Sequence, residues 1–466
     1  MCAGLVLGVA AGCSSNSKKD ANPVETLNTP TVTTSDHIKA IDEAEGSMDD
    51  PEVVASLYRV LWKPGYSITV REAALVKLEQ HDLDGLKKSI RQNLPREDSW
   101  GWLTRVCEII AERGWVDLSP ALVSSWARPT VYVKCHMERP EYKALAQLHG
   151  SENVTEVVFT MYVESKGAVN SGLRSRCWDL LHRLGQRERL VAMLESTNVP
   201  EDDALLLDLR AGAVDLGIVP MNKEEILWLR KLREPKRAEF WSRAVTVVQT
   251  LPPQRKAEVE LRDLPIIVSA SLYDTELLNM TRDELYARVD AYLREQKHYI
   301  QESNYDGFAG SQRLYEYKDS LTWGDLAAML IAVRALQVQP VVDHMFRYAD
   351  RDMEDTSTEF GGVIALDSKD RFEILEFPPM VRERDNKYVS SQAMLDAGYT
   401  AIFHFHLHAQ KHRNADYAGP GFGDINYADN TRANCLVFTF INEKSLNVDY
   451  YRHDRVVVDL GLIARP

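Results

Sequence analysis

The sequence predicts a chain of several domains, in which an all-α region of repeated helices precedes a smaller C-terminal α+β domain. Two patterns carry this prediction. From about Asp50 to Leu251, apolar residues recur every three or four positions, the period of a helix that buries one face. After Pro340 the pattern changes to short apolar runs separated by Gly, Asp and Asn, which is typical of strands and hairpins. The chain has 466 residues, a length that suggests about two to three domains.

The chain begins with a short apolar segment that ends at a cysteine. The run from Ala3 to Gly12 precedes Cys13 and falls far below the roughly 20 apolar residues that cross a bilayer. Small residues directly before the cysteine are typical of a cleaved secretory signal. Residues 1–13 therefore resemble the signal peptide and lipobox of a bacterial lipoprotein. This resemblance implies that Cys13 becomes the first residue of the mature protein and carries the lipid.

Residues 14–46 are rich in Ser, Thr, Asn and Lys, and we expect them to form a flexible polar tether. With a lipid on Cys13, the expected location is the bacterial cell envelope. Ser14, rather than Asp, follows the cysteine, and in this respect the chain resembles lipoproteins that are sorted to the outer membrane. We therefore expect the protein on the periplasmic face of that membrane, attached through the lipid anchor only.

Composition excludes several classes of function. The net charge of −14 and the pI of about 5.4 argue against a nucleic-acid partner, which requires a basic surface. The chain has six cysteines, and none of them forms a Cys-x-x-Cys pair. A zinc site built from cysteines is therefore excluded in practice.

Residues 47–262 are predicted to form helices of ten to fifteen residues joined by short loops. Examples of the apolar blocks are Val53–Trp62, Trp102–Ile110 and Phe240–Val248. Segments Ile68–Arg91 and Leu173–Glu195 resemble one another, since each has a helix, a tight turn and a Leu-rich helix. This region resembles a degenerate array of HEAT-type repeats. An irregular helical domain without true repeats is the alternative, and either would serve as a scaffold.

Residues 263–337 are predicted to continue as a helical connector. Thr281, followed three residues later by Glu284, is typical of the start of a capped helix. Residues Trp323–Val333 are predicted to form a strongly apolar helix, and Tyr299–Asp319 a loop.

Residues 338–466 are predicted to form the α+β domain. The predicted strands are residues 360–366, 372–377, 399–408, 436–441, 446–451 and 456–460. The predicted helices are residues 341–348 and residues 390–397, the second of which is closed by Gly398.

Three histidines in the third of these strands point to a metal centre. His404, His406 and His408 alternate with large apolar residues, so all three imidazoles share one face of the strand. Two such histidines and a carboxylate from a nearby loop would bind Zn²⁺ and leave a fourth position open, as in catalytic sites. Asp424 is the best candidate carboxylate. The predicted ligands are His404, His406 and Asp424, and strand geometry leaves His406 with His408 as an alternative pair.

The order of elements around the histidine strand resembles the JAMM/MPN metalloprotease family, over residues 340–466. The shared features are Glu359 before Phe-Gly-Gly at the start of a hairpin, a helix, a strand ending in His-x-His, and a Pro-Gly-x-x-Asp turn. The resemblance implies that the histidine pair and Asp424 bind zinc, that Glu359 is the general base, and that an amide or isopeptide bond is hydrolysed. Three residues differ from the family's usual Ser or Thr, Pro and Ser: Phe405, Leu407 and Gly421.

Two functions follow from these patterns. The first is a membrane-tethered zinc hydrolase of the cell envelope, whose helical region recruits a polypeptide substrate or protein partner. The second is a non-catalytic lipoprotein that acts as a binding or scaffold protein and carries a degenerate JAMM-like domain. Bound zinc together with chelator-sensitive peptide cleavage would support the first function, and a metal-free protein with a tight partner the second.

Overall fold

The computed structural model describes residues 22–128, 130, 132–133, 135–167, 170–195, 202–256, 258–300, 312–382 and 387–466. The chain divides into two compact units, one of residues up to Ser165 with Gly172–Arg183, the other of Lys166–Ser171 with Leu184–Pro466. No single helix in the described part is long and apolar enough to cross a membrane. Helices α18 (Trp323–Ala335) and α19 (Gln339–Glu354) meet that test only as a pair, with a bend of 87° between them.

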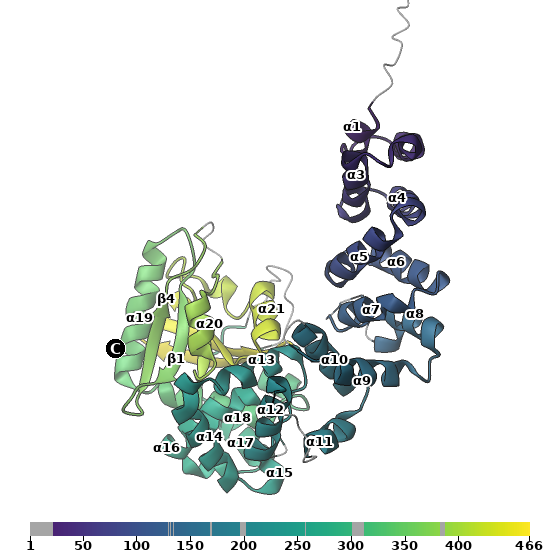
Figure 1. Cartoon of the computed structure of the whole chain (residues 1–466). Helices are drawn as coiled ribbons and strands as arrows, with labels where there is room; N and C mark the ends of the chain where they lie inside the picture. The colour runs from purple at the N-terminus through teal and green to yellow at the C-terminus, as the bar shows by residue number, and fades with distance from the viewer. Residues whose placement is uncertain are drawn as a thin grey trace, which may run out of the picture. The chain divides into compact units, whose positions relative to one another are not determined.

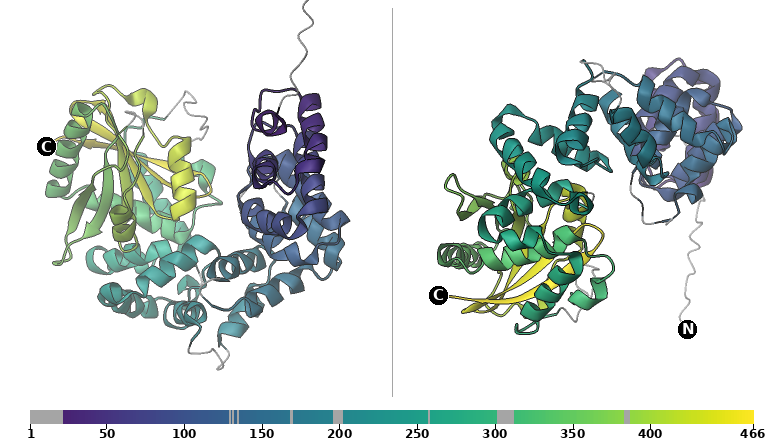
Figure 2. Two further views of the ribbon diagram at one scale, coloured as in Figure 1. Left: turned by 45° about the horizontal axis from the view of Figure 1, so that its top comes forward. Right: turned by 90° about the horizontal axis from the view of Figure 1, so that it is seen from below.

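The first unit is built from helices that lie one after another along the unit (Figures 1 and 2). They are α1 (Pro23–Leu27), α2 (Thr34–Glu43), α3 (Pro51–Trp62), α4 (Ile68–His81), α5 (Leu83–Asn93), α6 (Trp100–Glu112), α7 (Ser119–Trp126), α8 (Pro140–His149), α9 (Val154–Glu164) and α10 (Ser171–Arg183). Neighbouring helices pack on one another, for example α3 on α4 and α6 on α8. Their apolar stripes are buried between them, and Leu57, Trp102 and Trp126 are completely inaccessible. The predicted helical character of this region is confirmed.

The structure differs from the predicted polar tether in residues 22–46. Helices α1 and α2 form there, and they bury Leu27 and Ile41. The polar residues that suggested a tether cap these helices: the side chains of Asn22 and Thr33 accept hydrogen bonds from the backbone N–H groups of Val24 and Asp36. Composition alone could not distinguish helix caps from a solvated linker.

The second unit starts with helices that continue up to the sheet. They are α11 (Arg187–Glu195), α12 (Ala204–Ala211), α13 (Lys223–Leu232), α14 (Ala238–Thr250), α15 (Pro253–Lys256), α16 (Leu264–Tyr273), α17 (Arg282–Leu293), α18 and α19. The capped start predicted at Thr281 is present, since Thr281 and Glu284 each bond the other's backbone N–H. The residues expected to form one helical array, 47–262, are therefore shared between the two units.

A mixed six-stranded sheet forms the C-terminal part, which confirms the predicted α+β character. Its strands are β1 (Gly361–Leu366), β2 (Phe372–Phe377), β3 (Phe403–His408), β4 (Cys435–Asn442), β5 (Ser445–Arg452) and β6 (Val456–Ala464). The strand order is β2-β1-β3-β4-β5-β6, with β3 and β4 parallel and the other neighbours antiparallel. Two further helices, α20 (Gln392–Gly398) and α21 (Phe422–Thr431), precede and follow β3.

The two faces of β3 meet different surroundings, because its side chains alternate. Phe405 lies on the face covered by α19, where it contacts Tyr348 and Phe438. The histidines lie on the opposite face. There Val363, the cross-strand partner of His404, packs against Met394 of α20. All six residues of β3 are buried, so the histidines lie in the interior of the fold.

A buried ionic network joins the helices of this unit to the sheet. Asp325 of α18 accepts hydrogen bonds from Arg262 at 2.7 Å and from Arg452 of β5 at 2.9 Å. Tyr450 donates to the same carboxylate at 2.9 Å, and Arg262 also donates to Asn434 at 2.7 Å. Burial opposes ionisation of Asp325, but the two guanidinium groups hold its pKa well below the usual range. The network fixes the packing of α18 against the sheet.

Candidate metal centre

Strand register brings the first carboxylate to the histidines. Gly361 of β1 is the cross-strand partner of His406 in β3, so the same register places Glu359 opposite His408. The backbone N–H of Leu407 donates to the carbonyl of Phe360 at 2.9 Å, which continues the pairing toward that end of β1. Glu359, His406 and His408 are each only 5% exposed.

Helix α21 brings the second carboxylate. Asp424 is the third residue of α21, and its Oδ2 accepts a hydrogen bond from the backbone N–H of Gly421 at 2.7 Å. This contact holds the carboxylate back over the first turn of the helix. Its Oδ1 then lies 3.2 Å from His406 Nε2, and its Oδ2 lies 3.7 Å from His408 Nε2.

Glu359, His406 and His408 form a buried group that could hold a metal ion. One donor atom of each lies within 4.8 Å of the other two. The two Nε2 atoms of His406 and His408 are 3.1 Å apart, and Glu359 Oε1 lies 3.9 Å from His408 Nε2. We call these three residues together with Asp424 the metal group. It comprises two imidazoles and two carboxylates, which are ordinary ligands of divalent metal ions.

The hydrogen bonds around the imidazoles leave Nε2 directed inward. His408 Nδ1 lies 2.8 Å from the carbonyl oxygen of Tyr417, which can only accept, so Nδ1 carries the proton. Burial, followed by the neighbouring His406, lowers the pKa of His408 to about 4, so this ring is neutral at pH 7 and its Nε2 carries no proton. His406 Nδ1 lies 3.4 Å from the Tyr451 hydroxyl. A histidine ligand is typically held in this way through its outer nitrogen.

Asp424 is ionised at neutral pH. Burial by itself would raise its pKa, but the adjacent imidazoles of His406 and His408 and the N–H of Gly421 lower it to about 2. The group therefore presents a negatively charged oxygen and a neutral imidazole nitrogen at its centre.

The remaining histidine of the strand, His404, lies apart from this group. His404 Nδ1 is 2.7 Å from the hydroxyl of Tyr427 in α21, and its Nε2 lies close to Gly398 of α20. Burial lowers the pKa of His404 to about 4. Of the residues named from the sequence, the structure thus brings together Glu359, His406, His408 and Asp424. The position of Cys13 lies outside the described residues.

Three neighbours of the metal group were not identified from the sequence. Gln410 and Asn414 lie in the segment between β3 and α21, and Tyr451 lies on β5. Amide and hydroxyl side chains in a loop carry no periodic signal. Only the folded chain shows which of them reach the histidines.

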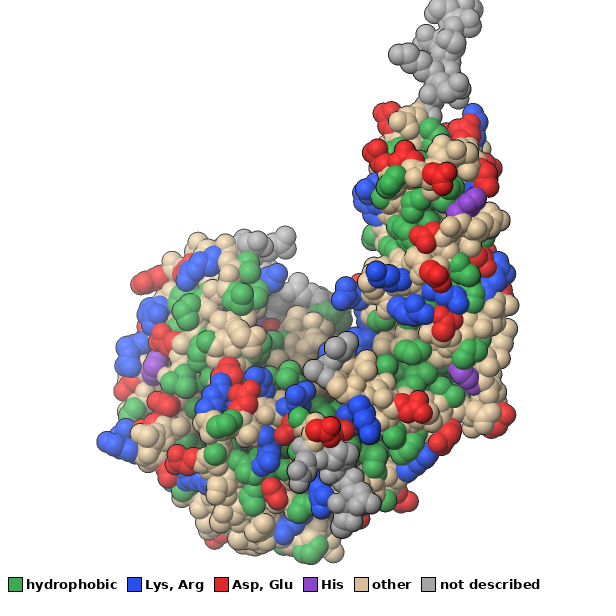
Figure 3. All heavy atoms as spheres, in the orientation of Figure 1, with side chains coloured by type: hydrophobic (Ala, Val, Ile, Leu, Met, Phe, Trp, Pro, Cys, Tyr) green, Lys and Arg blue, Asp and Glu red, His purple; other side chains and the backbone are tan. Residues whose placement is uncertain are grey.

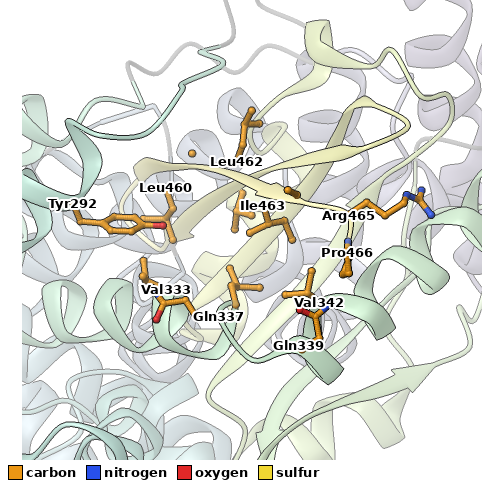
Figure 4. A pocket seen from close by; sticks show the side chains of 14 residues that line it. Tyr292, Val333, Gln337, Gln339, Val342, Leu460, Leu462, Ile463, Arg465 and Pro466 are labelled. Atoms are coloured by element: carbon orange, nitrogen blue, oxygen red, sulfur yellow. The ribbon is translucent and has the colours of Figure 1, made fainter.

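The metal group is distinct from a cavity elsewhere in this unit. That cavity of about 350 Å³ lies between the end of β6 and helices α17 to α19, and its walls include Tyr292, Val333, Val342 and Leu462 (Figure 4). Charges of both signs are interspersed over the face drawn in Figure 3, so the net charge of −14 is not gathered into one patch there.

Comparisons with protein-family models, with curated proteins and with solved structures found no match to this chain.

Proposed function

We propose that the metal group binds one divalent metal ion and that this ion is zinc. The observation that carries the proposal is the pair of Nε2 atoms of His406 and His408, which face each other at 3.1 Å with Asp424 Oδ1 3.2 Å from the first. If both outer nitrogens carry the ring protons, two lone pairs face each other inside the protein. Their repulsion would be relieved by a cation, which would also neutralise the carboxylate.

The proposed ligands are His406, His408 and Asp424. In a tetrahedral zinc site with bonds of about 2.0–2.1 Å, neighbouring ligand atoms are about 3.3–3.4 Å apart. Here His406 Nε2 lies 3.1 Å from His408 Nε2 and 3.2 Å from Asp424 Oδ1, both close to that value, and His408 Nε2 lies 3.7 Å from the other oxygen of Asp424, Oδ2. Glu359 lies farther out, 3.9 Å from His408 Nε2. It is therefore suited to act beside the fourth position, and this ligand set uses the second of the two histidine pairs considered from the sequence.

We further propose that the centre hydrolyses an amide or isopeptide bond in a polypeptide. Bound zinc would lower the pKa of a coordinated water and polarise the scissile carbonyl. The Glu359 carboxylate would accept a proton from that water and pass it to the leaving nitrogen. The resemblance to the JAMM/MPN family supports the same roles. The helical region would recruit the substrate or a protein partner, and a lipid on Cys13 would attach the protein to the membrane.

Metal analysis and peptide cleavage by the purified protein test the proposal. We expect about one zinc per chain, and cleavage of a peptide library that stops with a chelator and returns with zinc. His406→Ala and His408→Ala should each lower zinc affinity by at least about 100-fold, because a ligand is lost. Glu359→Gln should keep the zinc and lower kcat by about 10²- to 10⁴-fold, because only the base is lost. His404→Ala is the matched control on the same strand face and should keep its zinc.

Several outcomes would overturn parts of this proposal. Stoichiometric iron in place of zinc would assign the centre to the class of iron sites held by two histidines and one carboxylate. A protein that binds no metal at neutral pH would mean that a proton on His406 Nε2 joins the group, and the non-catalytic scaffold would then be the better description. Loss of zinc in His404→Ala with zinc retained in His408→Ala would restore the first histidine pair.

A further inference from the structure

The segment Ala409–Gly421, between β3 and α21, contacts the metal group through two side chains. Gln410 Nε2 donates a hydrogen bond to Glu359 Oε1 at 2.8 Å. Asn414 Nδ2 donates to Gln410 Oε1 at 2.5 Å and to the carbonyl oxygen of His408 at 3.1 Å. The hydrogen bonds therefore form a chain from the backbone of one proposed ligand to the proposed base.

The chemistry of the end groups fixes the direction of this chain. The carbonyl of His408 can only accept, so the nitrogen of the Asn414 amide must face it. The same nitrogen also faces Gln410, so Gln410 presents its oxygen to Asn414 and its nitrogen to Glu359. Asn414 is itself held rigidly, because it is 1% exposed and its backbone N–H donates to the carbonyl of Phe440 in β4 at 2.8 Å.

We propose that Gln410 is a positioning residue for Glu359, and that Asn414 sets the orientation in which Gln410 does this. The inference rests on the proposed role of Glu359 as the base. A carboxylate that receives a fixed N–H donor on Oε1 keeps one rotamer and one orientation toward the histidines. Gln410 and Asn414 are not among the proposed metal ligands, so their substitution should change the rate rather than metal binding.

An isosteric substitution tests the direction of the chain. In Asn414→Asp the nitrogen becomes an oxygen, which can donate neither to His408 nor to Gln410. Gln410 would then turn its nitrogen toward Asp and its oxygen toward Glu359, where two acceptors repel. We expect both Asn414→Asp and Gln410→Ala to lower kcat by about 10- to 100-fold. KM and zinc affinity should stay within about twofold, and Asp416→Asn, an exposed position in the same segment, should change none of these values.

Two further readouts separate positioning from general loosening of the segment. In the double variant, Asn414→Asp should add little to the effect of Gln410→Ala, because its influence on Glu359 passes through that side chain. The visible spectrum of the cobalt(II)-loaded protein should shift in Gln410→Ala in the same direction as in Glu359→Gln, since the carboxylate beside the open position is displaced in both.

The outcomes distinguish this inference from the proposed function. A wild-type protein without bound zinc, or a Glu359→Gln variant with full activity, would overturn the proposed function. Normal zinc binding and a strong effect of Glu359→Gln, combined with an unchanged kcat in Gln410→Ala, would overturn only the positioning role. Additive effects of the two substitutions, or a tenfold loss of zinc affinity in either, would also contradict it and assign the segment a purely structural role.

Discussion

The histidines of β3 share one face of the strand but have different neighbours. His408 has its outer nitrogen on a backbone carbonyl and its inner nitrogen in the metal group, whereas His404 is enclosed by Tyr427 and Gly398. The period of two in the sequence placed both on one face but could not say which would meet Glu359. That depends on the register between β1 and β3, and a shift of two residues would keep the same face buried.

The surroundings of Asp449, a buried residue of β5, raise its pKa. Asp449 and Asn447 are both fully buried, and Asn447 donates to Asp449 Oδ2 at 2.9 Å. Among the described residues, Asp449 Oδ1 and Asn447 Oδ1 have no hydrogen-bond partner. Burial and the negative charge of neighbouring Asp459 raise the pKa of Asp449 well above its ordinary value. A proton retained on Asp449 would supply the missing donor.

This predicts that Asp449→Asn makes the protein relatively more stable as the pH rises. The folded-state pKa lies above the unfolded value of about 3.9, so the stabilising contribution of neutral Asp449 is complete below that value and is lost as the pH rises toward the folded pKa. An amide has no such dependence. In urea unfolding between pH 4 and pH 8, the free-energy difference between variant and wild type should grow by up to about 1.4 kcal/mol per pH unit. A constant difference over this range would contradict the assignment.

At the scale of elements, strands were easier to predict than helices. β1 and β2 are found within one residue of the predicted ranges, because polar turns bound both apolar runs. β3 begins at Phe403 rather than Tyr399, since the apolar residues between them belong to the buried turn after α20. Helix α21 was not predicted at all. Its sequence FGDINYADNT is poor in helix-forming residues, and packing against β5 helps to stabilise it.

The sequence predicted the candidate site in part. Residue type and spacing identified His406, Asp424 and the alternative ligand His408, and the resemblance to the JAMM/MPN family identified Glu359. Neither could identify Gln410 or Asn414, since the path of the loop between β3 and α21 depends on tertiary contacts.

A pair of glycines in α20 and α21 tests how tightly these helices pack at the site. A Cβ atom on Gly398 would lie 2.2 Å from His404 Nε2, whereas one on Gly423 would meet no atom within 4 Å. We expect Gly398→Ala to destabilise the protein by about 1–3 kcal/mol because the histidine must move. Gly423→Ala should be neutral or stabilise it by up to about 1 kcal/mol, because alanine favours the helix. Equal unfolding free energies for the two variants in urea would contradict the described packing.

At the scale of the molecule, the sheet does not form a unit by itself. The network of Arg262, Asp325 and Arg452 ties it to helices that precede residue 338, the boundary expected from the change of sequence pattern. Removing one partner from such a buried network typically costs about 3–5 kcal/mol, because a charge is left buried without compensation.

We therefore predict that residues 338–466 do not fold in isolation, whereas residues 184–466 do. Circular dichroism and NMR dispersion of the two fragments would measure this. The longer fragment should unfold in one cooperative transition. A shorter fragment with dispersed resonances and a sharp transition would show that the network is dispensable.

Attachment to the membrane remains a separate prediction for the whole chain. A labelled fatty acid should enter the wild-type protein and not Cys13→Ala when both are made in bacteria, because Cys13 would be the only acceptor. Cys2→Ala is the matched control and should label like wild type, since Cys2 would be removed with the signal peptide. Equal labelling of wild type and Cys13→Ala would exclude the lipidation.

The parallel pairing of β3 with β4 has a consequence for the order of folding. Parallel neighbours need a crossover connection, and here the crossover carries α21 and Asp424. Glu359 lies before the β1–β2 hairpin, so the metal group closes only after the hairpin has docked and the crossover has returned to the sheet. Such distant pairings form slowly because loop closure costs entropy before contacts repay it. We therefore expect metal uptake to be a late event in refolding. A bound ion would link the crossover to β3 and slow its unfolding.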